Sequence, residues 1–319
     1  MILPIKSFAA NLSIPFTRKD NESFGMQFYF GPNHYQTLEQ YNIQLERVIP
    51  LGWSIFRYIN IYVVIPIFNW LDGMGMNYGI IILILTIIFK IFMFPLAYKT
   101  FLSSAKMRVL KPEIDEINKK FEGKDAMEKQ QATMSLYKKA GVSPFAGCLP
   151  LLVQMPILFA LLRFFPSSIE LRQQPFLWAH DLSTYDSIFN FGFAVPFYGD
   201  HVSLFALLMT VSTLIYTWTN SQMLSTGSQL PGMKIMMYAM PVLFLGFLNT
   251  TSAGLSYYYF LANMFNIGQT FLMRTFIDEE ALHRKIQENK KKPVKKSSFQ
   301  ERLEKIQKER QKQLSQRKK

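Results

Sequence analysis

Residues 78–96 read YGIIILILTIIFKIFMFPL, an apolar run with one lysine, Lys90, in its interior. The length of this run suits a helix that crosses the hydrocarbon core of a bilayer. A charged side chain at membrane depth is costly unless it faces a protein cavity or water. Lys90 is therefore the first candidate for a functional residue.

The rest of the chain fits the same class of protein. Of its 319 residues, 49% are hydrophobic, and the polar residues are gathered into blocks, as in polytopic membrane proteins. The single cysteine, Cys148, is interpreted as a small buried hydrophobic residue. Four further apolar segments bring the predicted spans of this all-α protein to five, at approximately 144–165, 202–219, 233–248 and 255–273.

The positive charges predict the orientation of these spans. The loop between the first two spans carries ten lysines and arginines, and the segment after Arg274 is richer still, so both are expected in the cytoplasm. The loop between the second and third spans has one arginine against four acidic residues and is expected outside. Five spans then place the N-terminal region outside and the C-terminus in the cytoplasm.

Two segments precede the first span. Residues 50–73 have apolar residues three or four apart, interrupted by polar ones and by Pro66, which favours an amphipathic helix lying in the outer interface. A sixth span is the alternative, because Arg57 could snorkel. Residues 1–49 lack a convincing signal peptide, and 24–38 (FGMQFYFGPNHYQTL) is interpreted as the last strand and turn of an external domain. The chain is accordingly expected to be a fragment without its upstream anchor, although a natural chain that exports its own N-terminus is the alternative.

The basic loop and the tail are expected to be structured differently. Within 98–142, apolar residues three and four apart on both sides of Gly123 predict an antiparallel helical hairpin, either a docking site or a solvated connector. The tail, 275–319, follows Arg274; counted from that residue it has sixteen basic and seven acidic residues. Such a tail suits ribosomal RNA or anionic lipid, and the alternative is a simple topological signal.

Polar residues inside the spans are predicted to gather in the cytoplasmic half. Thr86 and Lys90 are one helical turn apart, Gln154 lies within the second span, and Asn263 and Asn266 lie in the last. Ordinary interhelical hydrogen bonding could explain the amides alone. The lysine favours a hydrated groove.

Three stretches carry a family resemblance: MFPLAYKTFLSSAKMRVLKPEIDEI (93–117), LYKKAGVSPFAGCLPLLVQMPILFALLRFF (136–165) and ELRQQPFLWAHDLS (170–183). They resemble the YidC membrane protein insertases, relatives of the mitochondrial Oxa and chloroplast Alb proteins, over 26–274. The resemblance implies a five-helix core, 77–274, in the bacterial inner membrane. That core would enclose a hydrophilic groove open to the cytoplasm and to lipid.

The resemblance also implies residue roles and partners. Lys90 matches the groove's positive charge, which is arginine in many members; Thr86 and Gln154 match groove positions, and Tyr258 and Tyr259 match aromatic positions of the last helix. The implied partners are nascent membrane proteins, the Sec translocon, the ribosome at the basic tail, targeting factors at the hairpin, and anionic lipid.

Other functions are less consistent with the sequence. No nucleotide motif and no constellation of metal ligands or nucleophiles is visible, so we expect neither an enzyme nor a cofactor. An anion transporter or channel is the competing class, because a cation with facing amides could be an anion site. Against it stands the lack of an internal repeat. An intramembrane protease is a distant third.

Overall fold

The computed structural model describes residues 9, 11–14, 23–122, 126–142, 149–224, 233–277 and 279–291. The protein is mostly helical, and it divides into two compact units, Met1–Pro32 and Asn33–Lys319. In the first unit the described residues form no strand, so the strand predicted within 24–38 is wrong; the second unit opens with a short helix, α1 (Tyr35–Glu39).

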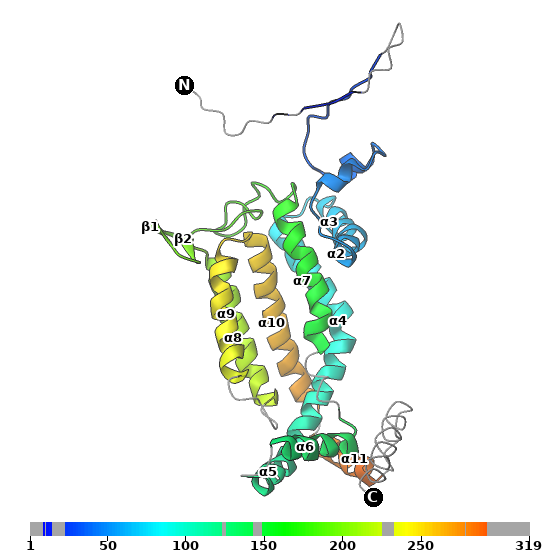
Figure 1. The fold of residues 1–319 in the computed structure, drawn as a ribbon, viewed down its shortest axis with the longest axis vertical. Helices are drawn as coiled ribbons and strands as arrows, with labels where there is room; N and C mark the ends of the chain where they lie inside the picture. The colour runs from blue at the N-terminus through cyan, green and yellow to red at the C-terminus, as the bar shows by residue number, and fades with distance from the viewer. Residues whose placement is uncertain are drawn as a thin grey trace, which may run out of the picture. The chain divides into compact units, whose positions relative to one another are not determined.

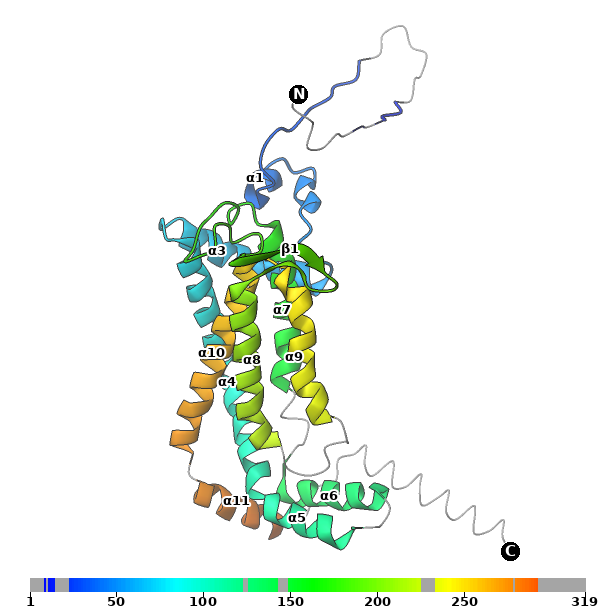
Figure 2. The same ribbon diagram turned by 90° about the vertical axis from the view of Figure 1, so that its left-hand side faces the viewer.

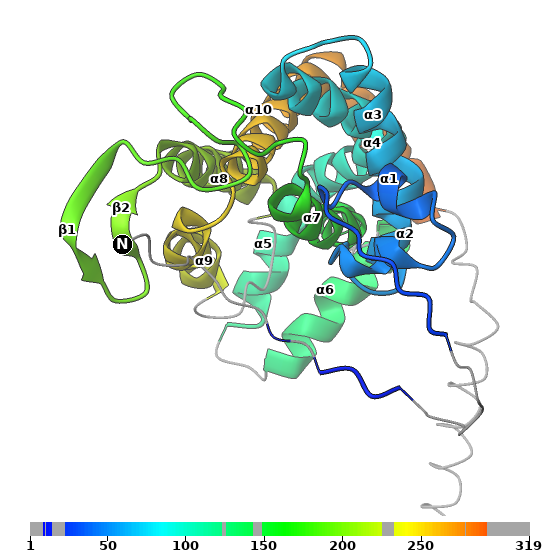
Figure 3. The same cartoon turned by 90° about the horizontal axis from the view of Figure 1, so that it is seen from above.

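Each of the five predicted apolar segments corresponds to one long helix. Figures 1 and 2 show them side by side, and Figure 3 shows α10 next to α8 and α4. One described helix, α4, is long and apolar enough to cross a membrane by length and composition, while α7, α8 and α9 hold shorter apolar runs. The bounds are α4 (Tyr78–Val109), α7 (Leu149–Ser167), α8 (Leu204–Leu224), α9 (Met233–Asn249) and α10 (Ala253–Phe276).

Helix α4 begins where the sequence predicts and ends much later. The Asn77 side chain accepts a hydrogen bond from the Gly79 amide at 2.9 Å, which caps the first turn. Pro95 lies inside the helix without ending it, and the helix continues to Val109. The first part of the predicted hairpin segment, 98–109, is therefore a continuation of α4.

Residues 55–72 form one continuous helical segment: α2 (Ile55–Ile59), a π turn, η2 (Asn60–Val64), and α3 (Ile65–Asp72). Pro66 lies inside this continuous segment, just after the π turn, and does not end it. Asn60 is fully buried, and its amide nitrogen donates to the carbonyls of Leu51 (2.9 Å) and Ala160 (2.8 Å). These bonds fix the segment to α7. The 3-10 turn η1 (Leu45–Val48) precedes it.

The loop between α7 and α8 contains the only sheet in the described part of the chain, which the all-α prediction missed. Strand β1 (Phe189–Val195) pairs antiparallel with β2 (Gly199–Val202). The same loop covers the start of α10, because the amides of Ala253 and Gly254 donate to the carbonyls of Thr184 and Leu182. A Cβ at Gly254 would lie 3.0 Å from the Leu182 carbonyl oxygen, so this approach favours glycine.

The loop is anchored to α8 by a buried carboxylate. Asp186 is 3% exposed and accepts hydrogen bonds from the Trp178 indole (2.8 Å), the Ser203 hydroxyl (2.5 Å) and the amides of Leu204 (2.9 Å) and Phe205 (3.1 Å). The last two amides belong to the first turn of α8, whose N–H groups have no partner within the helix. Asp186 thus caps α8 together with Ser203, whose hydroxyl accepts a hydrogen bond from the Ala206 amide at 3.1 Å.

At the C-terminal end of α4, helices α5 (Lys111–Lys120), α6 (Ala126–Ala140) and α11 (Glu279–Lys291) pack together. Leu282 and Ile286 of α11 are buried against Leu110, Ile114 and Tyr137, and burial raises the pKa of the Tyr137 hydroxyl. We call this set the hairpin cluster. Lys290 also forms an ion pair with Glu113. The first part of the predicted tail is therefore a folded helix that packs on α5 and α6, the two helices of the predicted hairpin segment. Residues 292–319 lie outside the described residues.

Candidate functional site

Lys90 is the only lysine or arginine that is buried among the residues whose burial the structure describes. It is 7% exposed, and its ammonium donates to the side-chain oxygen of Asn266 on α10 at 2.8 Å. Within the described chain no carboxylate lies in ion-pair distance of it. A neutral amide solvates a cation without cancelling its charge, so the site keeps a net positive charge.

The lysine side chain reaches along the bundle. Helices α4 and α10 contact each other near Ile82 and Gly254, where a Cβ on the glycine would be 3.4 Å from the isoleucine side chain. From that level Lys90 is eight residues along α4 and Asn266 is twelve along α10, or about 12 and 18 Å at 1.5 Å per residue. The ammonium is therefore directed toward the end of the bundle where the hairpin lies.

Gln154 contacts a different level of α10. Its amide nitrogen donates to the Tyr258 hydroxyl at 3.4 Å, about two turns from Asn266. The rings of Tyr258 and Tyr259 meet edge to face with centroids 5.2 Å apart. Tyr258 is fully buried, and the Tyr259 hydroxyl is a buried polar atom with no hydrogen-bond partner in the described chain. A buried hydroxyl without a protein partner is typical of an interior that also meets water or a polar ligand.

The remaining predicted residues bond elsewhere. Thr86 is fully buried and its hydroxyl donates to the Ile82 carbonyl of its own helix at 2.7 Å. Asn263 faces α8, with its amide nitrogen 3.1 Å from the Ser212 hydroxyl and 2.7 Å from the Thr213 hydroxyl. The predicted residues thus form three separate contacts, one each to α4, α7 and α8, and α10 contributes to all three.

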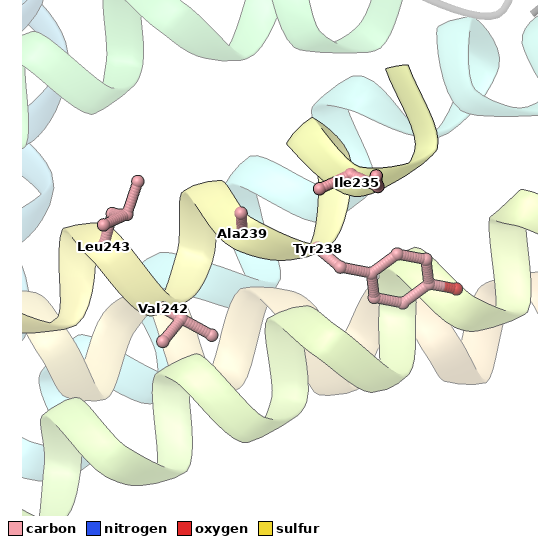
Figure 4. Close-up of a pocket in the computed structure, with 5 residues that line it drawn as sticks. All are labelled: Ile235, Tyr238, Ala239, Val242 and Leu243. Carbon is pink, nitrogen blue, oxygen red and sulfur yellow. The ribbon is translucent and has the colours of Figure 1, made fainter. Parts of the chain in front are cut away.

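Helix α9 adds an apolar surface. Ile235, Tyr238, Ala239, Val242 and Leu243 line a shallow pocket of about 630 Å³, and Figure 4 shows these five side chains along the helix. The pocket offers apolar contact and holds no charged residue. A long apolar ligand, such as a hydrophobic helix, suits this surface better than a small polar one.

Asn60 and Asp186 are structurally important residues that the sequence pattern does not single out. Asn60 is one of the polar residues that interrupt 50–73, and Asp186 is one of the four acidic residues in the loop between the second and third predicted spans. Asn60 lies between two isoleucines and Asp186 lies in the polar stretch STYDS (183–187), so neither has a distinctive sequence signal. Their importance lies in burial, which depends on distant segments.

Apolar helices around a buried cation that is held by an amide define a helical membrane protein whose interior accepts polar groups. Comparison with known proteins identifies the group. The family model described as "60Kd inner membrane protein" matches residues 70–280, and the chain belongs to this family.

Comparison with individual proteins gives the same family. The chain is 51% identical over 324 residues to the membrane protein insertase YidC of Parabacteroides distasonis, covering 97% of this chain and 51% of that protein. It is 48% identical to the YidC of Bacteroides fragilis, covering 96% of this chain and 51% of that protein. A crystal structure of an active YidC insertase with its first transmembrane domain resolved is similar with a TM-score of 0.51 and 27% identity, over 76% of this chain and 54% of that one. The chain thus spans about half the length of these curated relatives.

Proposed function

We propose that this chain forms the core of a membrane protein insertase, which inserts membrane proteins and helps them fold, alone or with the Sec translocon. The observation that carries the proposal is the buried Lys90 ammonium, held by Asn266 and not neutralised by any described carboxylate. Membership in a family whose curated members are named insertases supports it.

In the proposed mechanism, the groove and the apolar surface of α9 each lower part of the free-energy cost of moving a polar segment into a bilayer. Helices α4, α7, α8, α9 and α10 span the inner membrane, with the hairpin and the C-terminus in the cytoplasm and the N-terminal region in the periplasm. A short hydrophilic segment of the nascent chain enters the cytoplasm-open groove, where Lys90, Gln154 and the tyrosines replace part of its hydration. Its apolar helix meanwhile slides along the apolar surface of α9. No covalent step is required, so the chain acts without enzyme chemistry.

The outer end of the bundle stays closed in this mechanism. The loop between α7 and α8 covers it through the Asp186 cap and the bonds to Ala253 and Gly254. Closure on one side distinguishes an insertase from a channel, the competing function. Segment 50–73 lies at the same end, in the outer interface, where Trp53, Tyr58, Tyr62 and Trp70 are exposed and suit the headgroup region.

Reconstitution tests the proposal. Purified protein in proteoliposomes should insert a small single-span substrate, measured by protection from an added protease, without carrying anion flux. Anion flux without insertion would favour the transporter or channel. Vesicles without protein control for spontaneous insertion.

The partners are proposed from charge and surface. Residues 292–319 hold eleven basic and three acidic residues, which suits ribosomal RNA or anionic lipid. Targeting factors would meet the hairpin, α5 and α6, beside α11.

Two truncations separate these roles. Removing 292–319 should weaken ribosome co-sedimentation at low salt, with the intact protein losing its advantage at high salt, because phosphate contacts release counterions. Removing 279–319 should in addition uncover the hairpin cluster and make α5 and α6 sensitive to protease, since Leu282 and Ile286 no longer cover it. If the shorter truncation sediments as well as the intact protein at low salt, the tail is only a topological signal.

A further inference from the structure

The β1–β2 hairpin carries an exposed aromatic surface that the proposed function does not use. Residues 187–199 read SIFNFGFAVPFYG and contain no charged residue. Phe189, Phe191 and Phe193 alternate along β1, and the Phe191 ring centroid lies 5.5 Å from that of Phe189 and 6.0 Å from that of Phe193. With Phe197 of the connecting turn, we call these residues the aromatic patch. Exposed apolar patches on a protein mark a contact with another molecule or with a membrane.

Phe197 occupies a strained position at the tip of the hairpin. The turn is closed by the Tyr198 amide on the Val195 carbonyl at 3.1 Å, with Pro196 second and Phe197 third. Phe197 has φ +65°, a left-handed conformation that suits glycine or asparagine and costs a bulky residue about 1–2 kcal/mol. Its side chain is 99% exposed, so burial within the described chain does not compensate for the strain. Strain at an exposed aromatic points to a contact outside the chain.

The tip rests on α9 by its backbone. A Cβ at Gly246 would collide with the Phe197 carbonyl oxygen, so glycine permits this approach. Leu243 and Phe247, one turn or less away on α9, are 72% and 57% exposed. Figures 1 and 2 show the hairpin beside this end of α8 and α9. The aromatic patch therefore continues the exposed apolar surface of α9.

We propose that the aromatic patch is a lipid anchor, inserted in the outer interface of the bilayer beside α9. Continuity with the apolar surface of α9 and the lack of charge over 187–199 favour lipid over a protein partner. Addition of a partner strand is disfavoured, because the register shifts between Asn190 and Val195 and leaves an irregular edge. The inference rests on the proposed function in one respect, that α9 spans the membrane.

Depth-dependent quenching tests the anchor. The full chain with Cys148→Ser and Phe197→Cys, labelled with the fluorophore NBD, is reconstituted into phosphatidylcholine and phosphatidylglycerol vesicles that contain a lipid with a nitroxide near the headgroup end of its acyl chain. We expect blue-shifted emission and quenching at least about twofold stronger than for Arg172→Cys, an exposed position in the same loop.

A third label separates this inference from the proposed function. Leu243→Cys on α9 should be quenched by a nitroxide placed deep in the acyl chain. If Leu243 is quenched but Phe197 behaves like Arg172, α9 lies in the membrane and the lipid anchor is wrong. If Leu243 is not quenched either, the membrane-spanning arrangement of the proposed function has failed with it.

Discussion

Replacement of Lys90 by methionine should lower insertion of a substrate with a charged outer segment by about tenfold or more, whereas Lys90→Arg should insert it nearly as well as the original protein. Methionine keeps the length and apolar contacts of the side chain and removes only its charge, and the predicted role is charge in a low-dielectric interior. The measurement is protease protection of the substrate in proteoliposomes.

Stability and a matched surface residue make this test specific. Replacing a buried charge by an apolar residue of similar volume is commonly neutral or stabilising, so the thermal unfolding midpoint of Lys90→Met should not fall. Lys99→Met, which alters an exposed lysine of the same helix, should insert normally. Asn266→Ala should have a smaller effect than Lys90→Met, because it removes one hydrogen bond and keeps the cation. Full activity of Lys90→Met across several substrates would remove Lys90 from the mechanism.

Replacement of Asp186 by alanine should be the most destabilising single change considered for this protein, by about 2–4 kcal/mol in the free energy of unfolding. The substitution leaves the Trp178 indole, the Ser203 hydroxyl and two amides of α8 without their common acceptor. Unfolding of the intact chain in detergent, followed by circular dichroism or intrinsic fluorescence, measures the loss.

A second acid in the same loop provides the control. Among the described residues Asp181 accepts only from the amide and hydroxyl of Ser183, two residues away, so Asp181→Ala should cost about 1 kcal/mol or less. Asp186→Asn should fall between the two, because an amide oxygen can still accept from part of the set. Equal stability of the Asp186 and Asp181 variants would show that Asp186 does not anchor the loop between α7 and α8 to α8.

The local sequence was enough to place the long helices and to single out Lys90. Uninterrupted apolar runs locate helices because burial in lipid or in a bundle requires that length. One lysine in such a run is conspicuous because its desolvation is costly. Neither inference needs knowledge of distant residues, and the family resemblance rests on the same continuous stretches.

Segments without this strong local signal are predicted less well. The aromatic run after Asp186 belongs to the loop expected outside, and it forms a strand because β1 acquires its partner only from β2 across the turn at Pro196. The basic stretch after Arg274 looked uniform, yet Leu282 and Ile286 are enough to dock α11 on the hairpin. Two apolar residues in a charged segment give little indication until the surface that covers them is known.

The sequence by itself determined where the long apolar helices lie, that Lys90 is costly to bury, and which family the pattern resembles. Only the tertiary structure decided their partners: Asn266 for Lys90, Tyr258 for Gln154, and the first turn of α8 for Asp186. The physical reason is the separation along the chain of the residues on which each property depends. Helix formation and desolvation cost follow from neighbouring residues, whereas the Lys90–Asn266 bond joins residues 176 positions apart and exists only because α4 and α10 pack together.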